Sequence, residues 1–310
     1  MKQPFKEQVL DPSSKPLIFE VITPAMHAGK YQIHAHLERL MDVLGKRIDA
    51  INLPEIREES RTGARTVKYL PKMEPRIYGQ WVQNTFGIEA IVNRCTVYDT
   101  IERQRDWLEN TSRIYGIRNL VLVGGESSKA KYPGPSVTGC AGLAVANGLE
   151  YFLGGITIPS RPGEAERLHH KAQHGLEFFT SQVLYDSSAT KQLLASYDAY
   201  CRQHHAMPKR IFLSFAPASS KADIDFLKWL GVVISNETES HLLASGRGIA
   251  ARSIEVECEV FLDIVRFVEE KNIKVPIAIN VEHVMSHNLA VCRPLIDELF
   301  STYSSLSVLE

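Results

Sequence analysis

The sequence predicts an α/β fold, a closed (β/α)8 barrel, on three grounds. Eight short runs of β-branched and apolar residues alternate with longer stretches of helical periodicity. Strands that alternate with helices pair in parallel through right-handed crossovers. The 310 residues suit a barrel of about 250 residues with insertions. The alternative is an open doubly wound sheet, but its GxGxxG fingerprint is missing after the first strand, where residues 23–26 read TPAM.

The predicted elements follow one another in regular order. The strands cover residues 17–22, 48–53, 89–93, 119–123, 153–158, 178–182, 211–215 and 275–280. The helices cover residues 31–44, 100–115, 163–174, 187–205, 221–230, 249–271 and 284–303. The first helix carries its apolar residues on one face, Asp99 is a suitable N-cap for the second, and Gly175 is a suitable C-terminal glycine for the third.

Three segments depart from this alternation. Residues 1–15 are polar and contain prolines, which predicts a loose N-terminal arm on a single barrel domain that takes up the rest of the chain. Residues 124–148 are rich in Gly, Pro and Ser and form a long loop after the fourth strand, typical of a lid or binding loop. Between the seventh and eighth strands we expect two extra helices, joined by a short extended piece at 231–234.

Composition narrows the classes of function. The 44% of hydrophobic residues is typical of a globular protein with a sizeable core. A net charge of −1 without a long basic block argues against a nucleic-acid partner, and no run reaches the ~18 apolar residues that span a membrane. The five cysteines are widely spaced and form no CxxC pair, which indicates a reducing, cytoplasmic location without disulfides. His283 and His287 lack an HExxH context, so we expect no metal site.

Polar residues end six of the eight predicted strands, at the edge where barrels of this kind carry their chemistry. Glu20 interrupts an apolar strand, so it is either a structural polar contact or a general acid with a raised pKa. Gln182 also lies among apolar residues, where a buried amide needs a partner. We expect Glu20 and Gln182 to meet over one pocket. Gly124 and Gly125 indicate either a tight turn or the close approach of a flat or phosphorylated ligand.

Several segments resemble those of bacterial methylenetetrahydrofolate reductases. FEVITP at 19–24 resembles the family's first strand, FEFFPP, and FTSQVLYD at 179–186 resembles its ITQFFFD motif. VLVGGE at 121–126 resembles ALRGD of the fourth strand. Residues 158–175 are similar to the YPE-HPE segment, and residues 213–219 to the PGILPVS turn. The resemblance is collinear over about residues 17–285.

The resemblance implies FAD at the barrel mouth, NAD(P)H as electron donor, and reduction of 5,10-methylenetetrahydrofolate to 5-methyltetrahydrofolate. It implies that Glu20 is the general acid that helps to open the imidazolidine ring. It implies contacts with the tetrahydrofolate derivative for Gln182, Glu126, Phe226 and Leu227. It implies cofactor contacts for Asn52, Asn93, Gly124, Gly125, Glu126, Ile158 and Lys171.

Most departures from the family's motifs lie on the flavin side. The arginine of the fourth-strand motif is Gly124 here, the fifth-strand tyrosine is Ile158, and the segment that follows is shortened. Three hypotheses therefore stay open. The first is a flavin-dependent reductase. The second is a flavin-free folate-binding barrel that serves in methyl transfer or as a subunit of a one-carbon complex. The third is a non-catalytic interaction protein. A homo-oligomer or a partner subunit is compatible with each of them.

Overall fold

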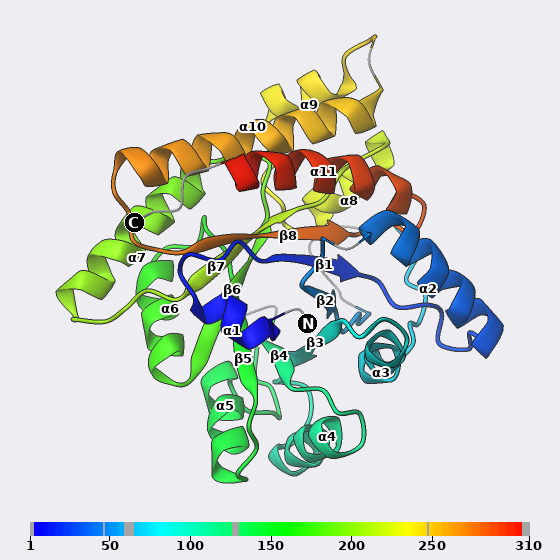
Figure 1. The fold of residues 1–310 in the computed structure, drawn as a ribbon, viewed down its shortest axis with the longest axis vertical. Helices are drawn as coiled ribbons and strands as arrows, with labels where there is room; N and C mark the ends of the chain where they lie inside the picture. Colours follow the sequence, from blue (N-terminus) through cyan, green and yellow to red (C-terminus); the bar gives the residue numbers. More distant parts are fainter. Residues whose placement is uncertain (1–2, 46, 59–64, 126–129, 247, 306–310) are drawn as a thin grey trace.

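The computed structural model describes residues 3–45, 47–58, 65–125, 130–246 and 248–305. Within these residues eight parallel strands close into a barrel, in which β8 pairs with β1 and each other strand pairs with its neighbours in sequence. Helices surround the strands on the outside (Figure 1). The fold is therefore a (β/α)8 barrel, and the predicted fold class is confirmed.

The elements have the following bounds. The strands are β1 (Leu17–Val21), β2 (Ala50–Leu53), β3 (Glu89–Cys95), β4 (Asn119–Val123), β5 (Phe152–Thr157), β6 (Leu176–Val183), β7 (Arg210–Phe215) and β8 (Ile277–His283). The helices are α1 (Phe5–Leu10), α2 (Lys30–Leu44), α3 (Pro75–Phe86), α4 (Ile101–Arg113), α5 (Val137–Ala146), α6 (Glu164–Gln173), α7 (Ser188–Gln203), α8 (Lys221–Trp229), α9 (Asn236–Leu243), α10 (Ile249–Glu270) and α11 (Leu289–Ser305).

Strand β1 shows how the sequence divides the core into two layers. Successive side chains of a strand point to opposite faces of the sheet. Leu17, Phe19 and Val21 pack outward against the helices. Ile18 packs inward with residues from the other strands of the barrel. The same alternation turns Glu20 inward, one step closer to the C-terminal end of the barrel than Ile18.

The N-terminal segment is not a loose arm, contrary to the prediction. Residues 5–10 form α1, which closes the N-terminal end of the barrel. The ring of Phe5 meets those of Phe152 and Phe178 edge-on, with centroids 6.0 and 5.8 Å away. The guanidinium of Arg210 donates to the carbonyls of Val9 (3.0 Å) and Ser14 (3.1 Å). Two buried apolar side chains, Phe5 and Val9, and one buried arginine therefore fix a segment whose composition is polar.

Two helices on the way from β2 to β5 were not predicted. Helix α5 lies within the segment expected to be a long loop, so the irregular stretch after β4 is shorter than expected. Its sequence, VTGCAGLAVA, is mostly small and apolar, and its N-terminus is capped by Ser136, whose Oγ accepts from the Gly139 amide (3.1 Å). Helix α3 begins at Pro75 and buries only a narrow face around Tyr78 and Val82.

The insertion between β7 and β8 holds three helices rather than two. The additional one is α9, a short and charged helix with a single buried residue, Leu242. The piece at 231–234 is not a strand, although Val232 and Ile234 are buried in a cluster beneath it. Helix α11 begins at Leu289, later than predicted, because residues after β8 first pass over the mouth of the barrel.

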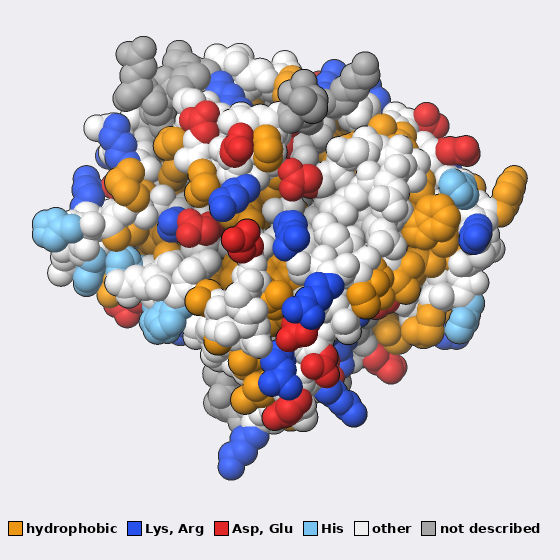
Figure 2. Space-filling model, turned by 60° about the horizontal axis from the view of Figure 1, so that its bottom comes forward, with side chains coloured by type: hydrophobic (Ala, Val, Ile, Leu, Met, Phe, Trp, Pro, Cys, Tyr) orange, Lys and Arg blue, Asp and Glu red, His pale blue; other side chains and the backbone are white. Residues whose placement is uncertain are grey.

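The outer surface carries charges of both signs. Figure 2 shows Lys and Arg side chains interspersed with Asp and Glu over the face that it draws, without one large patch of a single sign. None of the described helices has the length and apolar character needed to cross a membrane.

Candidate functional site

A cavity of about 460 Å³ opens at the C-terminal end of the barrel, and we call it the first cavity. Its floor includes Glu20 from β1 and Glu282 from β8. Its walls come from the β2–α3 connection, from α8 and from the residues that follow β8. The cavity therefore lies where barrels of this kind carry their chemistry.

The Glu20 carboxyl is held by two amides from neighbouring strands. The Nδ2 of Asn52 donates to its Oε2 at 2.5 Å, and the side chain of Asn93 also hydrogen-bonds to it. Burial raises the pKa of Glu20 well above its ordinary value, the charge of Glu282 raises it further, and the hydrogen bond from Asn93 lowers it. Glu20 thus has the raised pKa expected of a general acid.

Glu282 forms the second half of a carboxyl pair. Glu20 and Glu282 are register partners in the parallel pairing of β1 with β8. Burial raises the pKa of Glu282 to about 7, and a hydrogen bond from Ser214 opposes this rise. The Nδ2 of Asn280 donates to Glu282 Oε1 at 3.1 Å. Because burial raises both pKa values, both carboxyls keep their protons to a higher pH than an ordinary glutamate does.

Aromatic side chains of α8 form one wall. Phe226 and Trp229 are stacked, with ring centroids 5.6 Å apart. The guanidinium of Arg65, from the β2–α3 connection, lies 5.7 and 5.1 Å from their centroids, which is cation–π distance. Leu227 points the other way, into a separate apolar cluster, and does not line the cavity. Of the two substrate contacts expected on α8, the structure therefore brings only Phe226 into the same cavity as Glu20.

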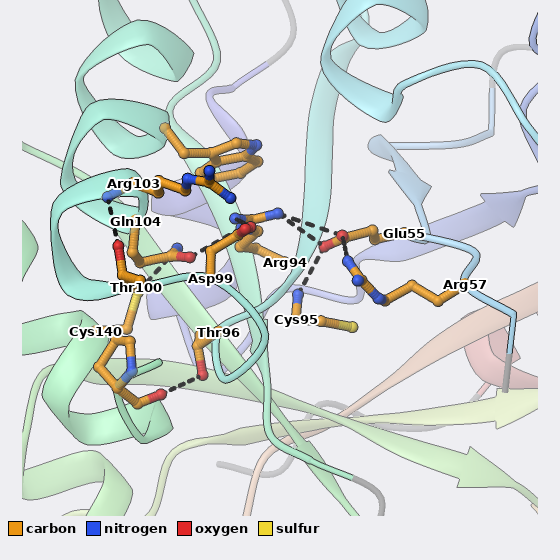
Figure 3. Close-up of polar contacts among 12 residues, drawn as sticks. Glu55, Arg57, Arg94, Cys95, Thr96, Asp99, Thr100, Arg103, Gln104 and Cys140 are labelled. Carbon is orange, nitrogen blue, oxygen red and sulfur yellow. Dashed lines mark hydrogen bonds and ion pairs between the residues drawn. The ribbon is translucent and has the colours of Figure 1, made fainter. Parts of the chain in front are cut away.

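Glu55 and Arg57 on the opposite wall are fixed by a polar network behind them (Figure 3). The Arg94 guanidinium on β3 bonds to Glu55 Oε1 at 3.3 Å and to Asp99. Its Nε also donates to Gln104 Oε1 (3.1 Å). Arg57 pairs with Glu55 at 2.8 Å. A nearly buried arginine thus sets the position of the carboxylate that orients Arg57 at the cavity wall.

Gln182 does not share the cavity of Glu20, and the expected convergence of these two residues is wrong. Its Nε2 donates to the Leu230 carbonyl at 3.1 Å, and its side chain lines a different cavity of about 60 Å³, together with Ile158. The pairing of β6 with β7 shifts register between Thr180 and Val183. Such an irregularity re-aims side chains, and the sequence does not reveal it.

The described residues that the resemblance assigns to the flavin do not line one common cavity: Lys171 lines one of about 440 Å³ and Ile158 another of about 60 Å³. Asn52 and Asn93 are bound to Glu20. A Cβ at Gly125 would lie 2.4 Å from the ring of Tyr132, so this glycine makes room for a tyrosine rather than for a flat ligand. Lys171 Nζ donates to the Ile156 carbonyl at 2.7 Å.

Two further positions complete the comparison with the resemblance. Gly124 faces the side chain of Val137 at an ordinary contact distance, and Glu126 lies outside the described residues. The cavity of about 60 Å³ beside Ile158 is far below the ~300 Å³ at which ligand pockets begin. The described residues that the resemblance assigns to the flavin therefore line no common cavity in which a flavin would fit. Within the described part of the chain, no three His, Cys, Asp or Glu side chains are placed to hold a metal ion.

The sequence reasoning missed Glu282, Arg65 and Trp229. The signal for Glu282 was present, because it follows Asn280 at a spacing of two and so lies on the same face of β8. Arg65 comes from the β2–α3 connection and Trp229 from the end of α8, and the sequence does not specify how either lies over the mouth.

Comparison with known proteins gives a structural relative but no family. No family model matches the chain, and no curated protein matches it. Among solved structures, an uncharacterized protein from Clostridium thermocellum that binds two copies of 5-methyl-5,6,7,8-tetrahydrofolic acid superposes with a TM-score of 0.76. The two chains are 20% identical, over 96% of this chain and 99% of the other. At this identity the likeness supports the barrel fold, and membership of the reductase family stays a prediction.

Proposed function

We propose that the chain is a flavin-free folate-binding barrel, in which a reduced folate occupies the first cavity and the Glu20–Glu282 pair supplies a proton to it. The observation that carries the proposal is this pair of carboxyls with raised pKa values, on the floor of a cavity with an aromatic wall. The Clostridium thermocellum protein supports it, because a barrel of the same fold binds 5-methyltetrahydrofolic acid.

The lining of the cavity matches the three parts of a reduced folate. Carboxyls such as Glu20 at the floor suit the N–H groups of the pterin. Phe226 and Trp229 suit stacking with the aminobenzoyl ring. Lys68 and Lys72 at the rim suit the carboxylates of the glutamate. The volume of about 460 Å³ falls within the ~300–1,000 Å³ of small-molecule sites.

The carboxyl pair has a direct chemical use. A folate nitrogen that releases its one-carbon unit leaves as a neutral amine only if it gains a proton. A carboxyl whose pKa is raised by burial and that lies at the cavity floor can donate that proton. The same donation serves transfer of a methyl group and opening of a methylene bridge. The methyl acceptor or hydride donor would then be a second substrate or a partner subunit.

Calorimetry with 5-methyltetrahydrofolate, and separately with FAD and FMN, tests the proposal. We expect folate to bind and the flavins not to bind. Phe226→Ala removes the stacking wall and should weaken folate binding on the order of tenfold, since aromatic contacts contribute about 0.5–1.5 kcal/mol beyond area burial. Tyr31→Ala, at an exposed tyrosine of α2, is the matched control and should change nothing. Failure of folate to bind would refute the proposal, and a tightly bound flavin would restore the reductase hypothesis.

A further inference from the structure

A second cavity, of about 710 Å³, adjoins the first. The two cavities share Ile22, Lys72, His283, Ser286 and His287, so they lie on opposite sides of a common wall. The far side of the second cavity is made by α2, through Gln32, His36 and Arg39 among others. None of the residues singled out in the sequence as substrate or cofactor contacts lines it.

The second cavity has an excess of positive charge. Arg39 and Lys72 reach it from two different elements, and Asp42 is the one carboxylate among its lining residues. Neither Arg39 nor Lys72 forms an ion pair with a carboxylate in the described part of the chain. Burial together with these two cations lowers the pKa of His36 to about 4.

Neutral hydrogen-bonding groups lie beside these cations. His36 Nδ1 lies 2.5 Å from the hydroxyl of Tyr78. The pKa of His283 is lowered to about 4 by burial, by His36 and by Lys72, so this imidazole is also neutral near pH 7. The cavity thus combines two cations, neither paired with a carboxylate among the described residues, with neutral imidazoles, and this combination suits a ligand that brings its own negative charge.

We propose that the second cavity binds carboxylate groups, with Arg39 and Lys72 as their counter-charges. Carboxylate can come from two sources. A separate carboxylate-bearing molecule can enter the second cavity by itself. Alternatively, a folate bound in the first cavity can carry a tail of γ-linked glutamates that extends past Lys72 into the second cavity. This second source rests on the proposed function.

The first experiment uses a probe without a pterin, tri-γ-glutamate, titrated into the full chain by calorimetry at low salt. We expect binding that weakens as salt is added. Arg39→Ala should weaken it on the order of tenfold, because the variant removes one of the two positive charges of the cavity. Arg105→Ala is the matched control, since Arg105 is a half-exposed arginine of α4 that lines neither cavity, and it should bind the probe as the wild type does.

A second experiment separates the two sources. The monoglutamate and triglutamate forms of 5-methyltetrahydrofolate are compared in wild type and in Arg39→Ala. A tighter triglutamate complex whose advantage is lost in Arg39→Ala identifies the tail as the source. Binding of tri-γ-glutamate with no advantage for the triglutamate folate identifies a separate ligand. Absence of both effects overturns the proposal. If tri-γ-glutamate binds but no folate does, the carboxylate site in the second cavity is supported and only the proposed function is refuted.

Discussion

Glu20 and Glu282 face each other across the β1–β8 pairing as direct register partners. Each carboxyl accepts hydrogen bonds from asparagine side chains. Asn52 and Asn93 hold the first carboxyl, while Asn280 holds the second. Two carboxyls in one partly buried site do not both ionise readily near neutral pH, because each negative charge opposes the other. The barrel closure that joins the first strand to the last is therefore also what creates the proton-bearing pair.

This pair makes the stability of the fold depend on pH. The folded-state pKa of Glu282 is about 7, whereas its ordinary value is 4.5. Between these values the folded protein binds a proton that the unfolded chain has released, so its stability falls as pH rises. One such group contributes at most about 1.4 kcal/mol per pH unit.

Glu282→Gln should therefore gain stability relative to the wild type as pH rises from 4.5 to about 7. Urea denaturation at several pH values measures the effect. The slope should shrink rather than vanish, since Glu20 still titrates. Glu166→Gln, at an exposed glutamate of α6, is the control and should follow the wild-type curve. Parallel wild-type and Glu282→Gln curves would contradict the assignment.

Ligand binding in the first cavity should be visible through one tryptophan. The chain has three tryptophans, and Trp229 is the one that lines this cavity. Trp81 lies against His34, and Trp107 lies near Arg94. A ring that stacks beside Trp229 changes its emission, so 5-methyltetrahydrofolate should quench the fluorescence of the wild type. Trp229→Phe should abolish most of the change, and Trp81→Phe should preserve it. Quenching that survives Trp229→Phe would place the ligand elsewhere.

The fold could be predicted because its pattern is repeated and local. Short apolar runs such as Leu17–Val21 identify the strands, and the period of two places Ile18 and Phe19 on opposite faces, without any long-range information. Helix α5 was not predicted because its residues are mostly small and apolar on all sides, so no apolar stripe marks it as a helix. Helix α1 was not predicted because Phe5 is buried only once the strands have closed into a barrel, and the sequence alone does not show the end of that barrel.

The site was predicted only in part, for reasons that lie in long-range pairing. Glu20 was identified because a carboxyl inside an apolar strand stands out in the sequence. Its partner Glu282 became visible only with the register between the first and last strands. Gln182 was misplaced because the register shift in β6 turns it toward Leu230. Whether Gln182 contacts a ligand stays a prediction.

The wall opposite the aromatic pair should depend on Arg94. Its side chain is 6% exposed, and its guanidinium bonds to Glu55, Asp99 and Gln104. Arg94→Met removes the counter-charge of Asp99 and one of the two arginines that pair with Glu55, so we expect a loss of about 3 kcal/mol in the free energy of unfolding. Folate affinity should also fall, because Glu55 orients Arg57 at the cavity.

Chemical denaturation and calorimetry on the same preparation measure the two effects of Arg94→Met. Arg105→Met makes the same chemical change at a half-exposed site on α4 and should cost little. A stable Arg94→Met variant with unchanged affinity would show that the network does not support the wall.

The N-terminal helix offers a test at the opposite end of the barrel. Phe5 is 1% exposed, and its ring packs against Phe152, Phe178 and Phe212 inside the barrel. Phe5→Ala should lower the free energy of unfolding by about 3–5 kcal/mol, because it removes a large buried ring and leaves a cavity. Ile114→Ala, at a 60% exposed position, is the control and should cost little.

Folate affinity should survive Phe5→Ala under conditions where the variant is folded, since Phe5 lies in the layer that closes the N-terminal end whereas the first cavity opens at the C-terminal end. Urea denaturation and calorimetry on one preparation separate the two quantities. A loss of stability below about 1 kcal/mol would mean that α1 does not seal the barrel in solution, because a buried phenylalanine truncated to alanine ordinarily costs several times more. Its first residues would then behave as the loose arm that their polar composition suggests.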